Sequence, residues 1–140
     1  MRVISGSLKG RPINFLKNID TRPLKDSVRE NLFNVLYHSN LIKTKIDKSN
    51  ILDLYSGIGS FGIECISRGA KKVTFIEQDK NAAAILKKNL INLSIINKSK
   101  IYNQKIENVI LQLNEQFDIF FLDPPFRDFN YLQNIELIKK

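Results

Sequence analysis

Cysteine, histidine and long apolar runs are scarce in this sequence, and each shortage excludes a class of protein. The 140 residues include one cysteine, Cys65, which excludes an internal disulfide framework and fits a reducing cytosol. One cysteine and one histidine cannot supply a conventional zinc site, so we expect no metal. No uncharged apolar stretch approaches the roughly 20 residues of a membrane span, and no apolar leader follows Met1. The sequence therefore predicts a cytoplasmic protein without membrane contact.

The charge balance indicates a polyanionic partner, because 22 Lys and Arg against 14 Asp and Glu give a net charge of +8. Residues 1–30 hold seven basic and three acidic residues, and four of the six arginines lie there: Arg2, Arg11, Arg22 and Arg29. Arginine binds phosphate or guanine through paired hydrogen bonds that lysine cannot match. We therefore expect this segment to face RNA or DNA, with a merely solvated basic face as the alternative.

Apolar patterning divides the chain into a substrate-side extension, residues 1–40, and an α/β core, residues 48–140, within one domain. Two short β-prone runs around glycine turns predict a hairpin, and a helix capped by Asp26 or Ser27 follows it. In the core, strands alternate with helices, which is typical of βαβ units and a parallel sheet. The predicted strands are 1–4, 11–15, 50–55, 72–77, 100–103 and 117–122, and the predicted core helices are 61–67, 80–93, 106–113 and 129–140.

The first core strand runs into a glycine-rich turn, Gly57-x-Gly59-x-x-Gly62, that opens a helix. Glycines there allow a tight turn and a close approach of the backbone to a ligand. Glu77 ends the next strand, where its carboxylate can accept both hydroxyls of a ribose. Asp53, inside the end of the first strand, would repel a pyrophosphate and suits a positively charged ligand such as S-adenosylmethionine. The alternative for Asp53 is an acid that satisfies backbone N–H groups of the turn.

A proline-rich turn, Asp123-Pro124-Pro125-Phe126, follows the last core strand. The Asp123 carboxylate and the Pro124 carbonyl can accept hydrogen bonds from an exocyclic amine, and Phe126 can stack on a planar base. Ligands of open parallel sheets bind beyond the carboxyl ends of the strands, which would bring this turn beside the glycine turn. Such a site can move a methyl group from a sulfonium to an amine by positioning and electrostatics. The alternative is a rigid turn with Phe126 in the core.

These motifs resemble those of the class I S-adenosylmethionine-dependent methyltransferases, and more closely those of the RsmD-type family. That family methylates the exocyclic 2-amino group of a guanine in bacterial small-subunit (16S) ribosomal RNA. The resemblance implies a Rossmann-like sheet in the order 3-2-1-4, S-adenosyl-L-methionine as cofactor and a small-subunit (30S) assembly intermediate as partner. The blocks that carry it are MRVISGSLKGR at 1–11, TRPLKDSVRENLFNVL at 21–36, DLYSGIGSFGIE at 53–64, IEQD at 76–79 and DPPF at 123–126.

The resemblance also implies roles for individual residues. Those implied to bind the cofactor are Asp53, Gly57, Gly59 and Glu77, and Tyr55 in the same turn can line the pocket or pack against the strands. Those implied to hold the target guanine are Asp123, Pro124 and Phe126. Those expected on the side of the substrate RNA are Arg2, Arg11, Arg22 and Arg29.

Family members continue beyond the helix that follows the proline-rich turn and add strands to the sheet. We therefore expect an unpaired outer edge on the fourth core strand, which is apolar and prone to self-association. Three other functions stay open. One is an amino-methyltransferase acting on adenine or cytosine in DNA or another RNA, and one is a non-catalytic remnant that binds cofactor or RNA. The third, a nicotinamide-dependent oxidoreductase, is opposed by both Asp53 and the proline-rich turn.

Overall fold

A parallel four-stranded sheet forms the centre of the computed structural model, which describes residues 1–15, 25–39, 44–124 and 131–139. The strand order is β3-β2-β1-β4, so the predicted fold class and strand order are confirmed. The strands are β1 (Asn50–Leu54), β2 (Lys72–Ile76), β3 (Ser99–Tyr102) and β4 (Ile119–Leu122). The helices are α1 (Asp26–His38), α2 (Ser60–Ser67), α3 (Lys80–Asn92), α4 (Ile106–Ile110) and α5 (Tyr131–Lys139), with a short 3-10 helix at Ile96–Lys98.

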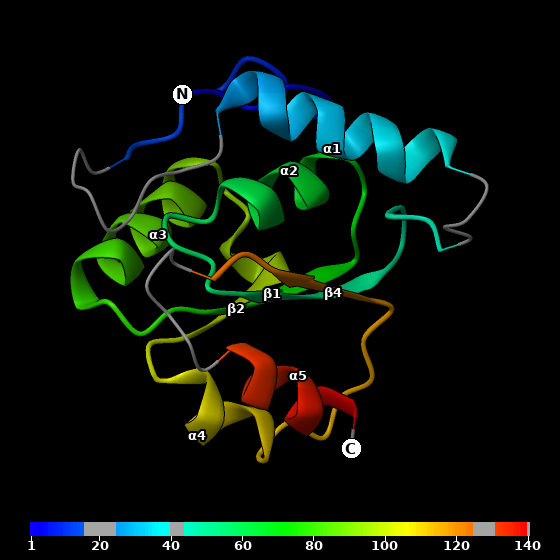
Figure 1. Ribbon diagram of the computed structural model, residues 1–140. Helices are drawn as coiled ribbons and strands as arrows, with labels where there is room; N and C mark the ends of the chain where they lie inside the picture. Colours follow the sequence, from blue (N-terminus) through cyan, green and yellow to red (C-terminus); the bar gives the residue numbers. More distant parts are fainter. Residues whose placement is uncertain (16–24, 40–43, 125–130, 140) are drawn as a thin grey trace.

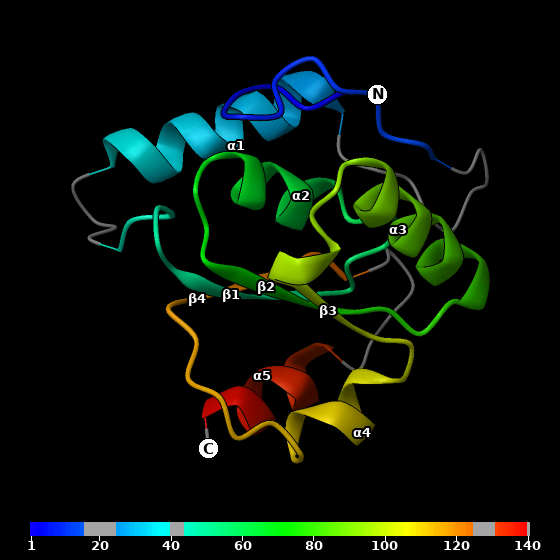
Figure 2. The same cartoon turned by 180° about the vertical axis from the view of Figure 1, so that it is seen from behind.

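Helices cover both faces of the sheet. Figures 1 and 2 show α1, α2 and α3 on one face, with α2 between the sheet and α1, and α4 and α5 on the other. Every residue of α2 is buried, because sheet and α1 enclose it from two sides. The larger apolar cluster fills the α2 side of the sheet, and a smaller one lies beneath it around Leu52, Leu54 and Val109. The carboxyl ends of the strands are thereby fixed against a packed core.

The two central strands and the helix that follows them form for reasons visible in their residues. Strands β1 and β2 are short apolar runs whose last four residues are all buried, as expected where helices cover both faces of a parallel sheet. Asp79 caps α3, because its carboxylate accepts a hydrogen bond from the backbone N–H of Ala82 at 2.8 Å. The start of α3 is thus fixed directly after the end of β2.

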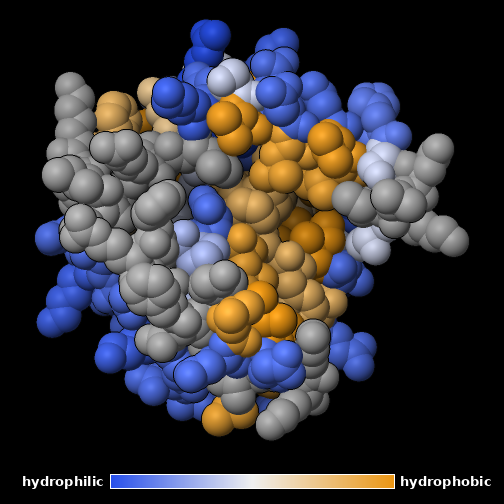
Figure 3. Space-filling view, viewed as in Figure 1, coloured by the Kyte–Doolittle hydropathy of each residue, from blue (hydrophilic) through white to orange (hydrophobic). Residues whose placement is uncertain are grey.

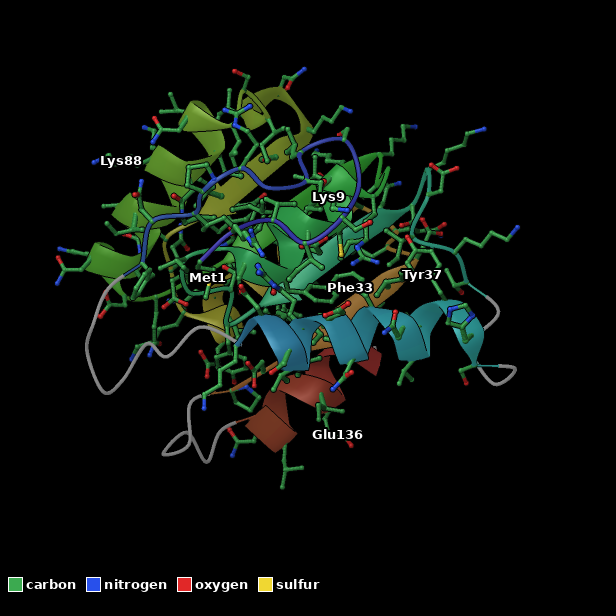
Figure 4. The ribbon with its side chains drawn as sticks, turned by 90° about the horizontal axis from the view of Figure 1, so that it is seen from above. Met1, Lys9, Phe33, Tyr37, Lys88 and Glu136 are labelled. Atoms are coloured by element: carbon green, nitrogen blue, oxygen red, sulfur yellow. The ribbon has the colours of Figure 1, made fainter. Side chains whose placement is uncertain are left out.

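The predicted N-terminal hairpin is present in a shortened form. Arg2 and Pro12 form an antiparallel bridge, and Val3 N, Gly10 N and Ile13 N donate across it to the carbonyls of Arg11, Val3 and Met1 at 2.9, 2.9 and 3.0 Å. The hairpin is also held by α2: Ser67 Oγ donates to the carbonyl of Ser5 at 2.6 Å and accepts from Leu8 N at 2.9 Å. Figure 4 shows this segment lying across α2, between α1 and α3.

Strand β4 forms one edge of the sheet among the described residues, and it starts at Ile119 rather than at residue 117. Its Phe121 ring stacks on Phe61 of α2 with the ring centroids 3.8 Å apart, while Phe120 is 44% exposed. Figure 3 shows hydrophobic side chains gathered on the face of the molecule between α1 and α5. The self-association expected of this edge stays a prediction, which sedimentation velocity can test.

Candidate cofactor and substrate site

The glycine-rich turn lies at the carboxyl end of β1 and has a left-handed backbone at three positions. Tyr55, Gly57 and Gly59 have φ values of 56°, 57° and 91°. Ser56 fixes the turn to β2, since its backbone N–H and its hydroxyl both donate to the carbonyl of Ile76, at 3.1 and 3.2 Å. The turn is therefore a rigid structure that leads straight into α2, as the motif predicts.

The three glycines of the motif meet different surroundings. A Cβ on Gly59 would overlap the side chain of Leu86 in α3, and a Cβ on Gly62 would overlap the ring of Phe75 in β2. These two glycines allow α2 and the turn to pack closely on their neighbours. No other described atom lies within 4 Å of a Cβ placed on Gly57, so the backbone there borders open space. Gly57 is thus the position where a ligand can approach the main chain.

Glu77 connects the glycine turn to the beginning of α3. One carboxylate oxygen accepts from Gly57 N at 2.8 Å, and the other accepts from Asp79 N at 2.9 Å. The side chain is half-buried, and Asn103 donates to the Glu77 backbone carbonyl at 2.8 Å from the end of β3. Three strand ends therefore converge on Glu77. Each oxygen of the Glu77 carboxylate still has a lone pair that can accept a hydrogen bond from a polar ligand.

Asp53 is a buried acid beneath the turn, with 1% of its surface exposed. One carboxylate oxygen accepts from Gly62 N at 3.1 Å, so the acid satisfies an N–H at the start of α2, as the alternative interpretation expects. The other oxygen, Oδ1, has no hydrogen-bond partner among the described residues. Burial raises the pKa of Asp53 well above its ordinary value; the bond from Gly62 opposes this, and the charges of Asp123 and Glu77 add to it. This site favours a neighbouring positive charge.

The Asp123 turn lies next to the glycine turn because β1 and β4 are parallel neighbours. Their register pairs Leu54 with Leu122, so the next residues, Tyr55 and Asp123, leave the sheet side by side. The Asp123 side chain is accessible to solvent at this end of the sheet, and partial desolvation raises its pKa. Pro124 is half-buried. Phe126 lies outside the described residues, so its stacking role stays a prediction.

The arginines predicted to face RNA have different environments. Arg2 and Arg11 are exposed, and Arg11 donates to the carbonyl of Asn92 at the C-terminal end of α3 at 3.0 Å. Arg29 is fully buried: its Nη2 donates to the Arg2 carbonyl and to Asp26 at 2.9 Å. The predicted contact of Arg29 with RNA is therefore wrong, because the guanidinium is buried where α1 meets the N-terminal segment. Arg22 lies outside the described residues.

Three buried polar side chains that fix the N-terminal segment were not identified from the sequence. Glu64 accepts from the backbone N–H groups of Ile4 and Ser5 at 2.8 and 3.0 Å and pairs with Arg68 at 2.9 Å. Ser67 accepts from the backbone N–H of Leu8, and Asn89 accepts from the backbone N–H of Asn14. A polar residue on an otherwise apolar helix face is the signal that could have indicated them.

Comparison with known proteins adds to this geometry. A family model described as "Conserved hypothetical protein 95" matches residues 1–140. "Ribosomal RNA small subunit methyltransferase D" of Haemophilus influenzae is 42% identical over 129 residues, which are 90% of this chain and 64% of that protein. The protein of the same name from Buchnera aphidicola subsp. Baizongia pistaciae is 40% identical over 140 residues, which are 100% of this chain and 68% of that protein. The chain belongs to the RsmD family.

Solved structures share the fold of this chain. The structure of yhhF from Escherichia coli, a protein assigned to the methyltransferases, superposes with a TM-score of 0.84 at 32% identity. It matches 100% of this chain, which corresponds to 72% of that chain. A protein from Thermus thermophilus superposes with a TM-score of 0.81 at 21% identity and supports the fold alone. The chain thus has the class I methyltransferase fold and spans about two thirds of the length of the curated relatives named above.

Membrane-spanning helices and metal-binding clusters are both absent from the part of the chain that the structure describes. In residues 1–15, 25–39, 44–124 and 131–139, no helix has the length and apolar character needed to cross a bilayer. In the same ranges, no group of three or more His, Cys, Asp or Glu residues comes together in a way that could hold a metal ion.

Proposed function

We propose that this chain binds S-adenosyl-L-methionine and transfers its methyl group to the exocyclic 2-amino group of a guanine in small-subunit ribosomal RNA. The observation that carries the proposal is the placement of Asp123 beside the glycine turn by the parallel pairing of β1 with β4. The names of the relatives support ribosomal RNA as the substrate class. The guanine, the amine and the cofactor are the parts of the proposal that go beyond those names.

Two features of the turn fit this cofactor. The unpartnered Oδ1 of Asp53 belongs to a buried acid whose raised pKa favours the neutral form until a cation binds beside it, which suits the cationic sulfonium or ammonium group of the cofactor. The open space above Gly57, beside the Glu77 carboxylate, admits a ribose whose hydroxyls donate to that carboxylate. The acidic surroundings of this turn oppose a pyrophosphate-containing dinucleotide. That charge balance favours a methyltransferase over a nicotinamide-dependent oxidoreductase.

When bound, the cofactor would supply a methyl group from its positively charged sulfur, which would be left as a neutral thioether once the amine nitrogen has taken the methyl group. The chain has to hold the amine in line with this methyl and to accept hydrogen bonds from its two N–H groups. The Asp123 carboxylate and the Pro124 carbonyl are the two acceptors. They draw the nitrogen lone pair out of conjugation with the base, and the carboxylate receives the proton that the product amine releases. The partial desolvation that raises the pKa of Asp123 makes it a better proton acceptor.

The test is transfer of a labelled methyl group from the cofactor to small-subunit particles, naked ribosomal RNA and duplex DNA, with mass spectrometry of the modified nucleoside. We expect methylated guanine in the ribosomal substrates, and duplex DNA as the best acceptor would contradict the proposal. Asp123→Asn should reduce transfer at least 100-fold because it removes the charged acceptor. Asp118→Asn, at the other end of β4, is the matched control, because its amide oxygen can still accept from Asn50 N. Cofactor binding without transfer would support the non-catalytic alternative.

A further inference from the structure

A groove between α3 and β3 lies outside the site described above. Lys80 and Lys87 line it from α3, at the two ends of a helix face whose middle is two alanines. The opposite wall is formed by Ile96, Ser99, Ile101 and Asn103. Residues 99, 101 and 103 alternate along β3 and its continuation, so they share one side of the strand. The groove has a volume of about 460 Å³, with small or apolar side chains at its centre and lysines at its ends.

The stretch of chain that forms both walls of this groove carries charge of one sign, and acids stand only at its borders, with Asp79 at the cap of α3 and Glu107 in α4. Residues 80–106 contain six lysines and no aspartate or glutamate, so this stretch alone carries +6 of the formal charge. A general bias toward lysine would scatter lysines along the chain and would not remove the acids from one region. Lys80 and Lys87 are exposed, and neither forms an ion pair with a described residue. Their charges are therefore available to a ligand.

One end of the groove borders the candidate cofactor site, and the helix that forms one of its walls also contacts the N-terminal segment. At one end, Asn103 donates to the carbonyls of Glu77 and Gln78 at 2.8 and 3.2 Å, which places this end beside the candidate cofactor site. At the other end of α3, Arg11 donates to the Asn92 carbonyl, so the N-terminal basic segment borders the same helix. Figure 4 shows Lys88 pointing outward from α3 as well. Positive charge thus extends from the N-terminal segment along α3 to the edge of the site.

We propose that the α3–β3 groove binds the sugar-phosphate backbone of the substrate RNA, away from the nucleotide that is methylated. This inference rests on the proposed function and extends its RNA-binding surface. Lys80 and Lys87 are seven residues apart on one helix, about 10.5 Å along its axis, so they contact two different phosphates of one strand. The Ser99 hydroxyl donates to the Ile95 carbonyl at 2.9 Å and the Asn103 amide donates to the carbonyls of Glu77 and Gln78, so the oxygens of both side chains are left to accept from ribose 2′-hydroxyls. The isoleucines give apolar contact to the sugar.

A repeating polyanion fits these features better than an acidic protein segment does. The positive charge is spread along a helix and onto the N-terminal segment, and arginine and lysine both contribute. An acidic peptide would place its carboxylates at irregular intervals and would bring apolar anchors to a larger apolar surface than the two isoleucines provide. The contacts reach phosphate and sugar only, so the groove adds affinity and orientation without reading sequence.

The experiment measures binding of a small-subunit ribosomal RNA transcript to the full chain between 50 and 200 mM salt. The double variant Lys80→Gln/Lys87→Gln removes two phosphate contacts. With a slope of about 0.7 per contact for single strands, it should lower the salt slope by about 1.4 and the affinity at about 0.1 M salt by about 25-fold. The charge-retaining pair Lys80→Arg/Lys87→Arg should bind like the wild type. Lys45→Gln/Lys71→Gln removes the same charge at the amino ends of β1 and β2 and serves as the control.

Each outcome decides the inference separately from the proposed function. Loss of affinity in the groove variant with little change in the control supports the inference. Equal loss in both variants means that net charge alone matters, and unchanged binding of the groove variant means that the groove is not used; either result overturns it. If the wild type methylates RNA and the groove variant binds RNA normally, the groove inference fails and the proposed function stays intact. If RNA binding depends on the groove but the chain transfers no methyl group, the groove inference stands and the proposed function fails.

Discussion

Replacing Asn89 tests whether the N-terminal segment and the glycine turn are held together by one side chain. Asn89 is 2% exposed, and its amide makes three hydrogen bonds. The amide oxygen accepts from Asn14 N at 2.9 Å, and the amide nitrogen donates to the carbonyls of Asn14 at 3.0 Å and of Ile58 at 3.2 Å. Asn89→Ala leaves all three backbone groups without this partner. At about 1 kcal/mol for each bond, the free energy of unfolding should fall by about 3 kcal/mol.

This loss should be visible as a lower melting temperature. An entropy of unfolding of about 2.1 cal/mol/K for each of the 140 residues converts about 3 kcal/mol into a decrease of about 10 °C. Asn89→Asp keeps the acceptor for Asn14 N but places a carboxylate oxygen against two carbonyls, so it should be at least as unstable. The cofactor should also bind more weakly to Asn89→Ala. Asn89 holds the carbonyl of Ile58, which lies between Gly57 and Gly59 of the turn.

Thermal and urea unfolding followed by circular dichroism provide the measurement, and calorimetry gives cofactor affinity. Asn92→Ala is the control: this asparagine is on the same helix and exposed, so its loss should change stability by less than about 0.5 kcal/mol. If Asn89→Ala unfolds at the same temperature and urea concentration as the wild type, the bridge contributes nothing measurable. That result would refute the idea that Asn89 connects the two parts of the site.

Three further outcomes follow from the structure. Asp53→Asn should raise the free energy of unfolding at pH 7, because burial raises the pKa of Asp53 and the wild-type protein loses stability as pH rises through that pKa. The gain should disappear below the pKa of the unfolded acid, about 4. Cofactor affinity of the variant should fall. Gly59→Ala should cost about 2–4 kcal/mol in urea unfolding, from a left-handed backbone and overlap with Leu86, whereas Gly10→Ala, which meets open space, should cost about 1 kcal/mol. Cys65 should react with a thiol reagent only in the unfolded chain, because it is buried and burial raises the pKa of its thiol.

Local patterns in the sequence predict the core of this fold well. The apolar runs of β1 and β2 and the glycine turn between β1 and α2 depend on neighbouring residues, so periodicity and turn chemistry indicate them. The closeness of Asp123 to the glycine turn also follows, because parallel strands bring their carboxyl ends to one edge. These features need no knowledge of which side chains meet across the core.

The attachment of the N-terminal segment could not be predicted in the same way. The basic cluster predicts an exposed Arg29, yet the side chain is buried and donates to the Arg2 carbonyl, a contact that depends on how α1 packs on the N-terminal segment. Glu64 and Asn89 hold residues about 60 and 75 positions away in the sequence, and no local pattern specifies such pairs. Charge clustering identifies the kind of partner, while individual exposure depends on tertiary packing.

The hydrogen bonds of the N-terminal segment determine when it becomes ordered during synthesis. Residues 1–14 leave the ribosome before their partners on α2 and α3, which are translated about 60 to 75 residues later. Until then the segment lacks these partners, and its closure must overcome the entropy of a long loop. The basic residues Arg2 and Arg11 therefore take their place only after α2 and α3 have been made. A nascent chain exposes them to nearby nucleic acid before the rest of the surface exists to give that contact a direction.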